Sequence, residues 1–311
     1  MMPPTFWIVL IGACRLDYGL KDEDSAVVPA VDVTETFDQA PRAGVDVLFV
    51  VDGTGSMVEE QATLAAAASR FVDALTRLSV AWQVGVTSTD PLDEGVLLGR
   101  PWIITRNTPD SAAIFADNLT IGGDRLPPSA GLYAAVSALA DADGANFGFR
   151  REDASLHLVF VSDDDDASDA HLGADPVAAL LAVVDAEAQR SGRSVKISAL
   201  VGDSPGGCSG PGGEARAGTR YTDLAEATGG LALSICQADL SGVAEALGAE
   251  GLEWPREFAL QAVPVPGSAV VRVDGARVLE GWTVASAVLI FDEAPAPGAH
   301  IEVDYRLEEG T

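Results

Sequence analysis

Two short stretches of the sequence place carboxylates directly after apolar runs. The first is Asp52–Ser56, "DGTGS", which follows the apolar run Val47–Val51. The second is Asp163, which follows the apolar run Leu156–Ser162. In an open parallel sheet, ligands bind at the carboxyl ends of the strands, where the strand order reverses. If the two runs are neighbouring strands, we expect their polar side chains to meet in one crevice.

The side chains of this set offer only oxygen ligands. The carboxylates of Asp52 and Asp163 and the hydroxyls of Thr54 and Ser56, together with water, suit Mg²⁺, Mn²⁺ or Ca²⁺ better than a thiol-seeking metal. The glycines between them let the backbone turn tightly. A simpler interpretation is that Asp52 only caps the following helix, but it leaves the two hydroxyls and Asp163 unexplained. We therefore expect a divalent cation here.

Strands and helices alternate along the chain from Val45 onward. Apolar runs predict strands, and apolar residues at helical spacing predict helices. The predicted strands are residues 47–51, 82–88, 156–162, 194–202 and 231–236. The predicted helices are residues 59–78, 111–118, 129–142, 175–189, 221–228 and 240–247. This alternation predicts an α/β fold with a doubly wound, mainly parallel sheet that helices cover on both faces.

The pattern changes near Trp254. Beyond it the sequence shows only short strands separated by Pro-Gly, Asp-Gly and Glu-Gly turns, and Asp274-Gly275 is typical of a hairpin. The strands expected there are residues 258–263, 269–273, 284–291 and 300–307. We therefore expect an α/β domain over residues 44–250 and a small β-sandwich-like module over residues 255–311.

The N-terminal residues predict export. The apolar run Phe6–Ala13 is too short to span a bilayer and indicates a signal peptide over residues 1–13. Its end, Ile11 to Cys14, resembles the lipobox of bacterial lipoproteins, which implies a lipid on Cys14. An ordinary signal peptide or a misplaced start codon are the alternatives. We expect residues 14–43 to be a flexible tether and the protein to be lipid-anchored at the bacterial cell envelope, periplasmic or outer surface, with no other membrane contact.

Composition excludes several functions. The chain of 311 residues carries 47 acidic and 19 basic residues, a net charge of -28. Such a surface repels phosphate backbones, so we expect no nucleic-acid partner. The sequence contains no His-Glu-x-x-His or phosphate-loop motif, and we expect no enzymatic activity.

Three cysteines are consistent with export. If Cys14 carries a lipid, Cys208 and Cys236 remain as a pair, which could form one disulfide in an oxidising compartment. The alternative is two unrelated buried thiols.

The motifs also resemble a known family. "VLFVVDGTGSM" is similar to the first segment of von Willebrand factor type A (vWA) domains, whose metal-ion-dependent adhesion site (MIDAS) has an Asp-x-Ser-x-Ser signature. Thr54 replaces the first serine and keeps the hydroxyl. "HLVFVSDDDD" resembles the family's later strand and implies that Asp163 belongs to the site. "RYTDLAEATGGLALSIC" and the cysteine pair resemble secreted bacterial vWA lipoproteins. The resemblance covers roughly residues 45–250 and implies the vWA fold.

The resemblance implies one more ligand and a role. The family's site takes a hydroxyl from a loop before a central helix, here residues 118–135, where Asp124 is the first candidate and Thr120 and Ser129 follow it. We expect Asp164–Asp166 to be a solvated acidic loop rather than further ligands. The implied function is metal-dependent adhesion at the cell surface, in which a carboxylate of an unidentified partner protein completes the shell of a Mg²⁺, Ca²⁺ or Mn²⁺ ion. The alternative is a structural surface lipoprotein with a vestigial site, which adheres through its C-terminal β module.

Overall fold

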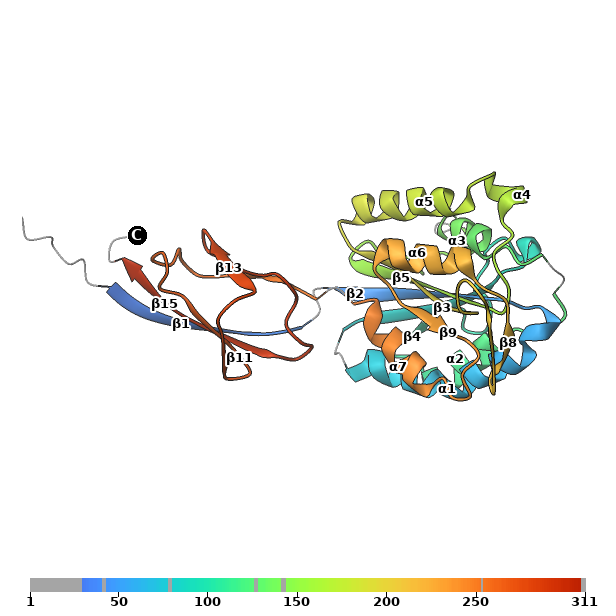
Figure 1. Ribbon diagram of the computed structural model, residues 1–311, viewed down its shortest axis with the longest axis horizontal. Helices are drawn as coiled ribbons and strands as arrows, with labels where there is room; N and C mark the ends of the chain where they lie inside the picture. The colour runs from blue at the N-terminus through green and yellow to red at the C-terminus, as the bar shows by residue number, and fades with distance from the viewer. Residues whose placement is uncertain are drawn as a thin grey trace, which may run out of the picture.

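The computed structural model describes residues 30–40, 43–77, 80–125, 128–140, 144–252 and 254–308. The predicted signal peptide and Cys14 lie outside the described residues. Figure 1 shows two units: an α/β unit that runs from β2 (Gly44–Val51) to α7 (Ser241–Glu250), and a smaller β module. Among the described residues, no helix has the length and apolar character that crossing a membrane requires.

The α/β unit is built on a six-stranded sheet in the order β4-β3-β2-β5-β6-β9 (Figure 1). Neighbouring strands pair in parallel, except that β4 is antiparallel to β3. Besides β2, the strands are β3 (Trp82–Ser88), β4 (Ile104–Thr105), β5 (Ala154–Ser162), β6 (Val195–Val201) and β9 (Ala232–Ser234). The predicted doubly wound, mainly parallel sheet is confirmed.

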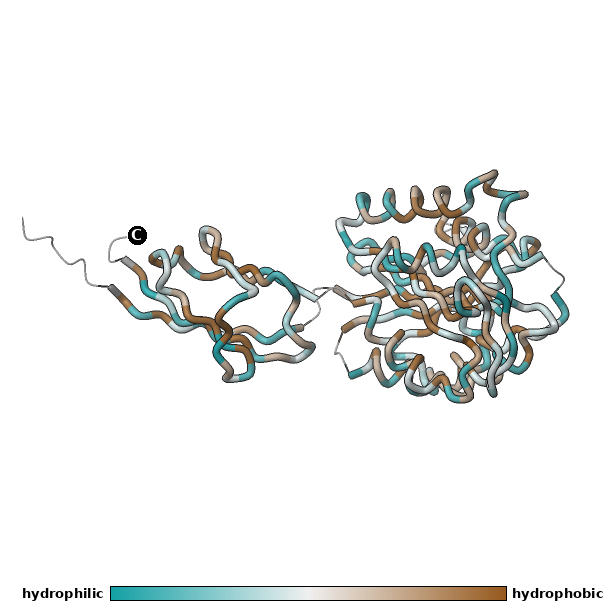
Figure 2. The backbone as a smooth tube through the Cα atoms, in the orientation of Figure 1, coloured by the Kyte–Doolittle hydropathy of each residue, from teal (hydrophilic) through white to brown (hydrophobic). Residues whose placement is uncertain are grey.

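Helices cover both faces of this sheet because its central strands are apolar on both sides. In β2, Val47 and Phe49 face one core cluster, whereas Leu48 and Val50 face the other. The first cluster is shared with α1 (Val58–Arg77), α2 (Ser111–Leu119) and α7. The second is shared with α3 (Gly131–Ala140), α5 (Pro176–Ser191) and α6 (Thr219–Thr228). Figure 2 shows the resulting hydrophobic centre of the unit. Short helices η1 (Gly55–Met57), η2 (Pro91–Asp93) and α4 (Asp169–Leu172) complete it.

The β module consists of two antiparallel sheets around a separate core. Its C-terminal strands are β10 (Glu257–Ala259), β11 (Val270–Val273), β12 (Ala276–Val278), β13 (Trp282–Ala285), β14 (Val288–Phe291) and β15 (His300–Glu308). The hairpin predicted at Asp274-Gly275 is confirmed, since both residues have positive φ and join β11 to β12. The single strand predicted over residues 284–291 is wrong, because Ser286 turns at φ 55° and separates β13 from β14.

The predicted tether is wrong for its last part. Residues Ala30–Asp38 form strand β1, which pairs antiparallel with β15 along its full length and joins the four-stranded sheet β1-β15-β11-β12. Val33 and Phe37 pack against the module's core. Glu35, between them, is buried and accepts hydrogen bonds from the Gln261 main chain, at 3.0 Å, and from the Tyr305 hydroxyl. The module is therefore completed by chain from before the α/β unit.

Gln39 connects the segment that leaves the β module to two neighbouring segments. Its buried side-chain nitrogen donates to the carbonyl oxygens of Pro255 at 3.0 Å and of Pro295 at 3.1 Å. Pro255 lies on the segment that returns from α7. The outgoing and returning segments are thus held together at the module's end.

Candidate metal centre

The two predicted acidic residues follow neighbouring strands. Val51, the last residue of β2, pairs with Val161 of β5, and the Asp52 main-chain nitrogen donates to the Val161 carbonyl at 2.8 Å. Strand β2 leads through α1 on one face of the sheet, and β5 leads through α5 on the other, so the strand order reverses between them. Asp52 and Asp163 line one cavity of about 840 Å³ at this switch point.

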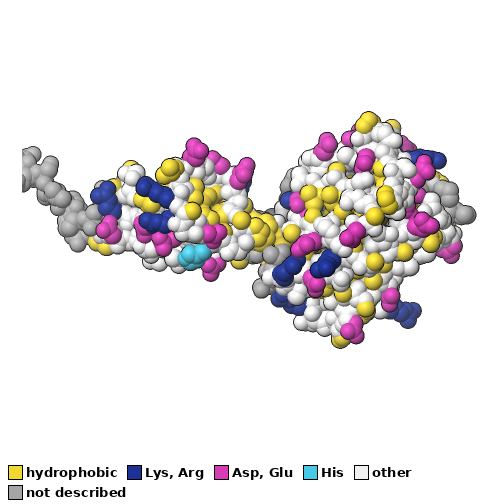
Figure 3. Space-filling model, turned by 60° about the horizontal axis from the view of Figure 1, so that its bottom comes forward, with side chains coloured by type: hydrophobic (Ala, Val, Ile, Leu, Met, Phe, Trp, Pro, Cys, Tyr) yellow, Lys and Arg dark blue, Asp and Glu magenta, His cyan; other side chains and the backbone are white. Residues whose placement is uncertain are grey.

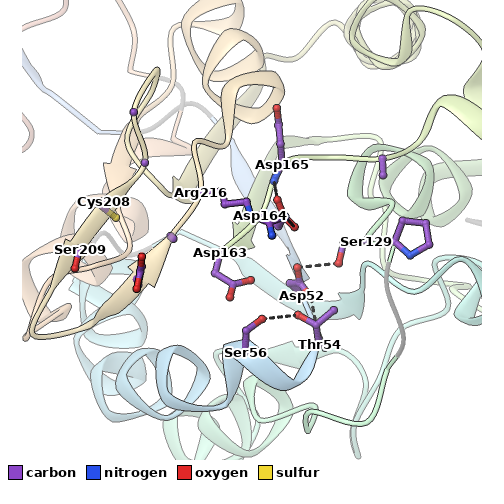
Figure 4. Close-up of a pocket in the computed structure, with 16 residues that line it drawn as sticks. Asp52, Thr54, Ser56, Ser129, Asp163, Asp164, Asp165, Cys208, Ser209 and Arg216 are labelled. Atoms are coloured by element: carbon purple, nitrogen blue, oxygen red, sulfur yellow. Dashed lines mark hydrogen bonds and ion pairs between the residues drawn. The ribbon is translucent and has the colours of Figure 1, made fainter.

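Asp52 is fully buried at the floor of the cavity. Its Oδ1 accepts a 2.9 Å hydrogen bond from the Thr54 main chain, and its Oδ2 accepts from the Ser129 hydroxyl at 2.8 Å (Figure 4). The Ser162 hydroxyl also donates to Oδ2, at 2.7 Å. These bonds fix the carboxylate in one orientation and compensate part of its desolvation.

The glycine-rich loop after β2 brings two hydroxyls to the same place. Thr54 and Ser56 line the cavity, and their side-chain oxygens lie 3.2 Å apart. The next residue, Met57, is fully buried and anchors the loop in the core. Figure 4 shows Ser56 and Asp163 facing the same space as Asp52. The structure therefore brings together Asp52, Thr54, Ser56 and Asp163.

The site carries more negative charge than its surroundings compensate. Burial raises the pKa of Asp163, and the charge of Asp52 raises it further, although a hydrogen bond with Ser56 opposes the change. Burial likewise raises the pKa of Glu60, to which the charge of Asp163 adds, and Glu60 Oε2 is buried without a hydrogen-bond partner. A cation in the cavity would oppose the rise in the pKa of Asp163, whereas Glu60 does not line the cavity. Glu60 was not predicted, because one acid in an acidic helix start carries no distinct signal.

The structure does not place Asp124 in the cavity. Asp124 is exposed and is not among the residues that line it, whereas Ser129 lines it and bonds Asp52. Thr120 donates to the Ala116 carbonyl of its own helix, at 3.0 Å. The preference for Asp124 over Ser129 therefore fails. The reason is the path of the loop, because its turn at residues 121–125 is held against residues 52–61 by hydrogen bonds.

Gln61 fastens that turn and was missed by the sequence analysis. The buried Gln61 side chain donates to the carbonyl of Asp52 at 2.8 Å and to that of Gly122 at 2.9 Å, and it accepts from the Gly122 main chain at 3.2 Å. The Arg125 main chain also donates to the Gly53 carbonyl at 3.2 Å. The sequence does not indicate these hydrogen bonds, because a glutamine is compatible with either the buried or the exposed face of a helix.

The acidic loop after Asp163 is only partly solvated. Asp166 is buried, accepts hydrogen bonds from the Ser168 hydroxyl and from the Leu132 main chain at the start of α3, and lies 3.6 Å from Arg220. A carboxylate is favourable at a helix N-terminus. The expectation of a solvated loop is wrong for Asp166, which positions α3 and with it Ser129.

A disulfide-linked hairpin forms another wall of the cavity. Strands β7 (Cys208–Gly210) and β8 (Gly213–Ala215) pair antiparallel, and both contribute residues to the lining. The predicted disulfide between Cys208 and Cys236 is confirmed. It ties the hairpin to the chain after β9, where Gly212 also donates to the Cys236 carbonyl at 3.0 Å.

The donor set fits a hard divalent cation. Two carboxylates and three hydroxyls, from Asp52, Asp163, Thr54, Ser56 and Ser129, border one cavity and supply only oxygen. No cluster of three or more His, Cys, Asp or Glu side chains suited to a metal occurs in the part of the chain that the structure describes. An ion here would therefore depend on hydroxyl groups and water for much of its shell.

Comparisons with known proteins give structural likenesses only. A scan against protein-family models finds no match, and a search of curated proteins finds none either. Among solved structures, a von Willebrand factor type A protein from Catenulispora acidiphila matches at 15% identity and a TM-score of 0.41, over 92% of this chain and 63% of its own. The pilus adhesin SpaC from Lactobacillus rhamnosus GG, in its open conformation, matches at 12% identity and a TM-score of 0.43, over 89% and 40%.

A third likeness is to proximal thread matrix protein 1 of the mussel byssus, in a structure described as having a zinc-occupied MIDAS motif. It matches at 12% identity and a TM-score of 0.40, over 70% of this chain and 47% of its own. The chain thus spans less than two thirds of the length of each of these proteins. At such identities and TM-scores, the likenesses establish neither the family of the chain nor its activity.

Proposed function

We propose that the protein is a non-enzymatic, metal-dependent binding protein of the bacterial cell surface. A divalent cation held by Asp52, Thr54, Ser56, Ser129 and Asp163 keeps one position for a carboxylate of a partner protein. The observation that carries this proposal is the convergence of Asp52, Ser56, Ser129 and Asp163 on one cavity at the switch point of the sheet. Mg²⁺ is the ion we propose first, with Ca²⁺ and Mn²⁺ as substitutes of the same preference for oxygen.

The charge of the chain makes the ion necessary for such binding. A net charge of -28 repels an acidic partner, and Figure 3 shows acidic side chains spread over both units on the face in view. An ion with few direct carboxylate ligands retains positive charge that attracts an anion. We therefore expect the partner to bind weakly when the cation is removed.

Export is the second part of the proposal. The Cys208–Cys236 disulfide is typical of proteins in oxidising compartments. We propose that the chain is exported and held at the envelope by a lipid on Cys14.

The proposal is tested first with the metal alone. Titration of the full chain with Mn²⁺, followed by electron paramagnetic resonance, should show one site whose affinity falls about ten- to hundredfold in Ser56→Ala and in Asp52→Ala. Ser56→Ala is included because the Ser56 side chain is exposed, so its loss should not disturb the fold even if Asp52→Ala does. Asp124→Ala is the matched control and should bind as the wild type does. Equal affinity in all four proteins would refute the proposed site.

The second arm uses a carboxylate probe. A surface bearing a peptide with one glutamate should retain the Mg²⁺-loaded chain, whereas the same peptide with glutamine should not. Chelation of Mg²⁺ and Ser56→Ala should both abolish retention. A chain without the β module that is no longer retained would instead favour the alternative, adhesion through that module.

A further inference from the structure

One basic side chain projects at the rim of the acidic cavity. Arg216 follows β8 and is the sole Lys or Arg among the described residues that line the cavity. Asp163, Asp164, Asp165 and Glu214 line it as well. Figure 4 shows Arg216 between the hairpin and Asp164, on the side of the cavity where Asp163 lies.

The main chain fixes Arg216 beside the candidate metal ligand. Its main-chain nitrogen donates to the Asp163 carbonyl at 2.8 Å. The hairpin that carries it is tied down by the disulfide at Cys208. The position of Arg216 relative to Asp163 is therefore set by backbone contacts, while its side chain stays accessible, with 81% of its surface exposed.

The guanidinium can exchange its partner at little cost. Nη1 donates to Asp164 Oδ2 at 2.9 Å, and the Asp164 side chain is itself 48% exposed. Ion pairs this exposed contribute little to stability. A guanidinium offers five N–H donors in a planar fork that matches a carboxylate. A carboxylate arriving from solution can therefore take the place of Asp164.

We propose that Arg216 is a specificity-determining residue that binds a second carboxylate of the partner. The partner segment would then be an acidic peptide with two neighbouring carboxylates, one completing the shell of the cation and the other bound by Arg216. This inference rests on the proposed function. Without Arg216, the acidic lining would repel every negative charge of the partner except the one at the ion.

The test compares two peptides of equal length, one with a single glutamate and one with two glutamates separated by one glycine. Binding to the full chain is measured by isothermal titration in saturating Mn²⁺. We expect the two-glutamate peptide to bind the wild type about three- to fivefold more tightly than the one-glutamate peptide. In Arg216→Ala this preference should fall to about twofold or less, the statistical advantage of two alternative glutamates for one ion, while the Mn²⁺ affinity is retained.

Two further variants and one control sharpen the test. Asp164→Asn removes the competing carboxylate and should increase the preference for two glutamates about twofold. Arg216→Lys keeps the charge but not the planar fork and should retain part of the preference. Arg77→Ala is the matched control: Arg77 is an exposed arginine in an ion pair with Glu245, at the opposite end of α1 from Ser56, and its loss should leave the preference unchanged.

The outcomes separate this inference from the proposed function. Metal-dependent binding with the same preference in wild type and Arg216→Ala overturns the role of Arg216 and leaves the metal site in place. Binding that needs Arg216 but is indifferent to Mn²⁺ and to Ser56→Ala overturns the proposed function and supports the Arg216 contact. Failure of both peptides to bind the Mn²⁺-loaded chain overturns both.

Discussion

Removal of the Cys208–Cys236 disulfide is a perturbation whose size follows directly from the fold. The bond closes a loop with a sequence separation of 28 residues. In the chain-entropy model, such a loop restricts the unfolded chain by about 12 cal/mol/K, or about 3.6 kcal/mol at 25 °C. For a unit of the size of the α/β unit, this corresponds to a decrease in Tm of about 7–14 °C.

The assay is chemical denaturation of three samples: oxidised wild type, reduced wild type and Cys208→Ala/Cys236→Ala. Alanine is preferred to serine because Cys236 is 6% exposed and packs in the core, where a hydroxyl would need a partner. Reduction of the wild type leaves both sulfur atoms in place, so it separates the loss of the cross-link from the cavity that alanine creates. Trp82, buried in β3, reports on the α/β unit.

We expect both altered samples to lose about 3–4 kcal/mol of unfolding free energy, the alanine variant slightly more. We also expect them to retain Mn²⁺ binding, because Asp52, Ser56 and Asp163 lie outside the hairpin, but to lose the preference for two glutamates. A loss below about 1 kcal/mol in both samples would refute the reasoning. It would mean that the cross-link restricts the unfolded chain less than the chain-entropy model requires.

Three further predictions concern Gln61, the buried His157 of the sheet, and the β module. Gln61→Ala should lower the unfolding free energy by about 2–3 kcal/mol, because three hydrogen bonds to Asp52 and Gly122 are lost. Chemical denaturation measures this loss, and Gln237→Ala, at an exposed glutamine, is the control. An equal loss of stability in the two variants would contradict the prediction. His157 is buried against Ser198, and burial, with the charge of Lys196, lowers its pKa to about 3. Below pH 6.5 the unfolded chain therefore binds a proton that the folded chain refuses, so stability should fall as the pH decreases from 6.5 towards 3, by at most about 1.4 kcal/mol per pH unit. Denaturation between pH 7.5 and 4.5 tests this, and a slope that persists in His157→Gln would assign it to other groups. Deletion of residues 30–38 should unfold the β module, because β15 loses its partner along the full length of β1; limited proteolysis should then cleave the module and spare the α/β unit, and a resistant module would show that β1 is dispensable.

Much of the α/β unit could be predicted because its strands are continuous apolar runs. Both faces of β2 and β5 are buried, so apolar residues predominate in their last five or six positions, and the residue after each run marks the carboxyl edge of the sheet. Asp52 and Asp163 could be found for this reason. Their meeting depends only on β2 and β5 being neighbours, which the alternation of strands and helices favours.

The remaining parts depend on contacts that local sequence does not encode. Strand β1 alternates inward and outward residues, but one inward position is Glu35, which interrupts the apolar pattern. Glu35 accepts hydrogen bonds from Tyr305 and Gln261, which lie near the other end of the chain. The choice between Asp124 and Ser129 depends on the path of a loop held by Gln61. In both cases a residue distant in the sequence determines the structure, and the local spacing of residues does not indicate that contact.

The placement of β1 and β15 at opposite ends of the described chain has a consequence for biosynthesis. Asp38 and His300 are register partners separated by 262 residues. A ribosome adding about 5–20 residues per second needs roughly 13–50 s to make that interval. Throughout this time β1 has emerged without its partner, while the α/β unit can already fold. An unpaired strand invites pairing with other chains, and the acidic residues Asp32 and Asp38 would discourage it during that wait.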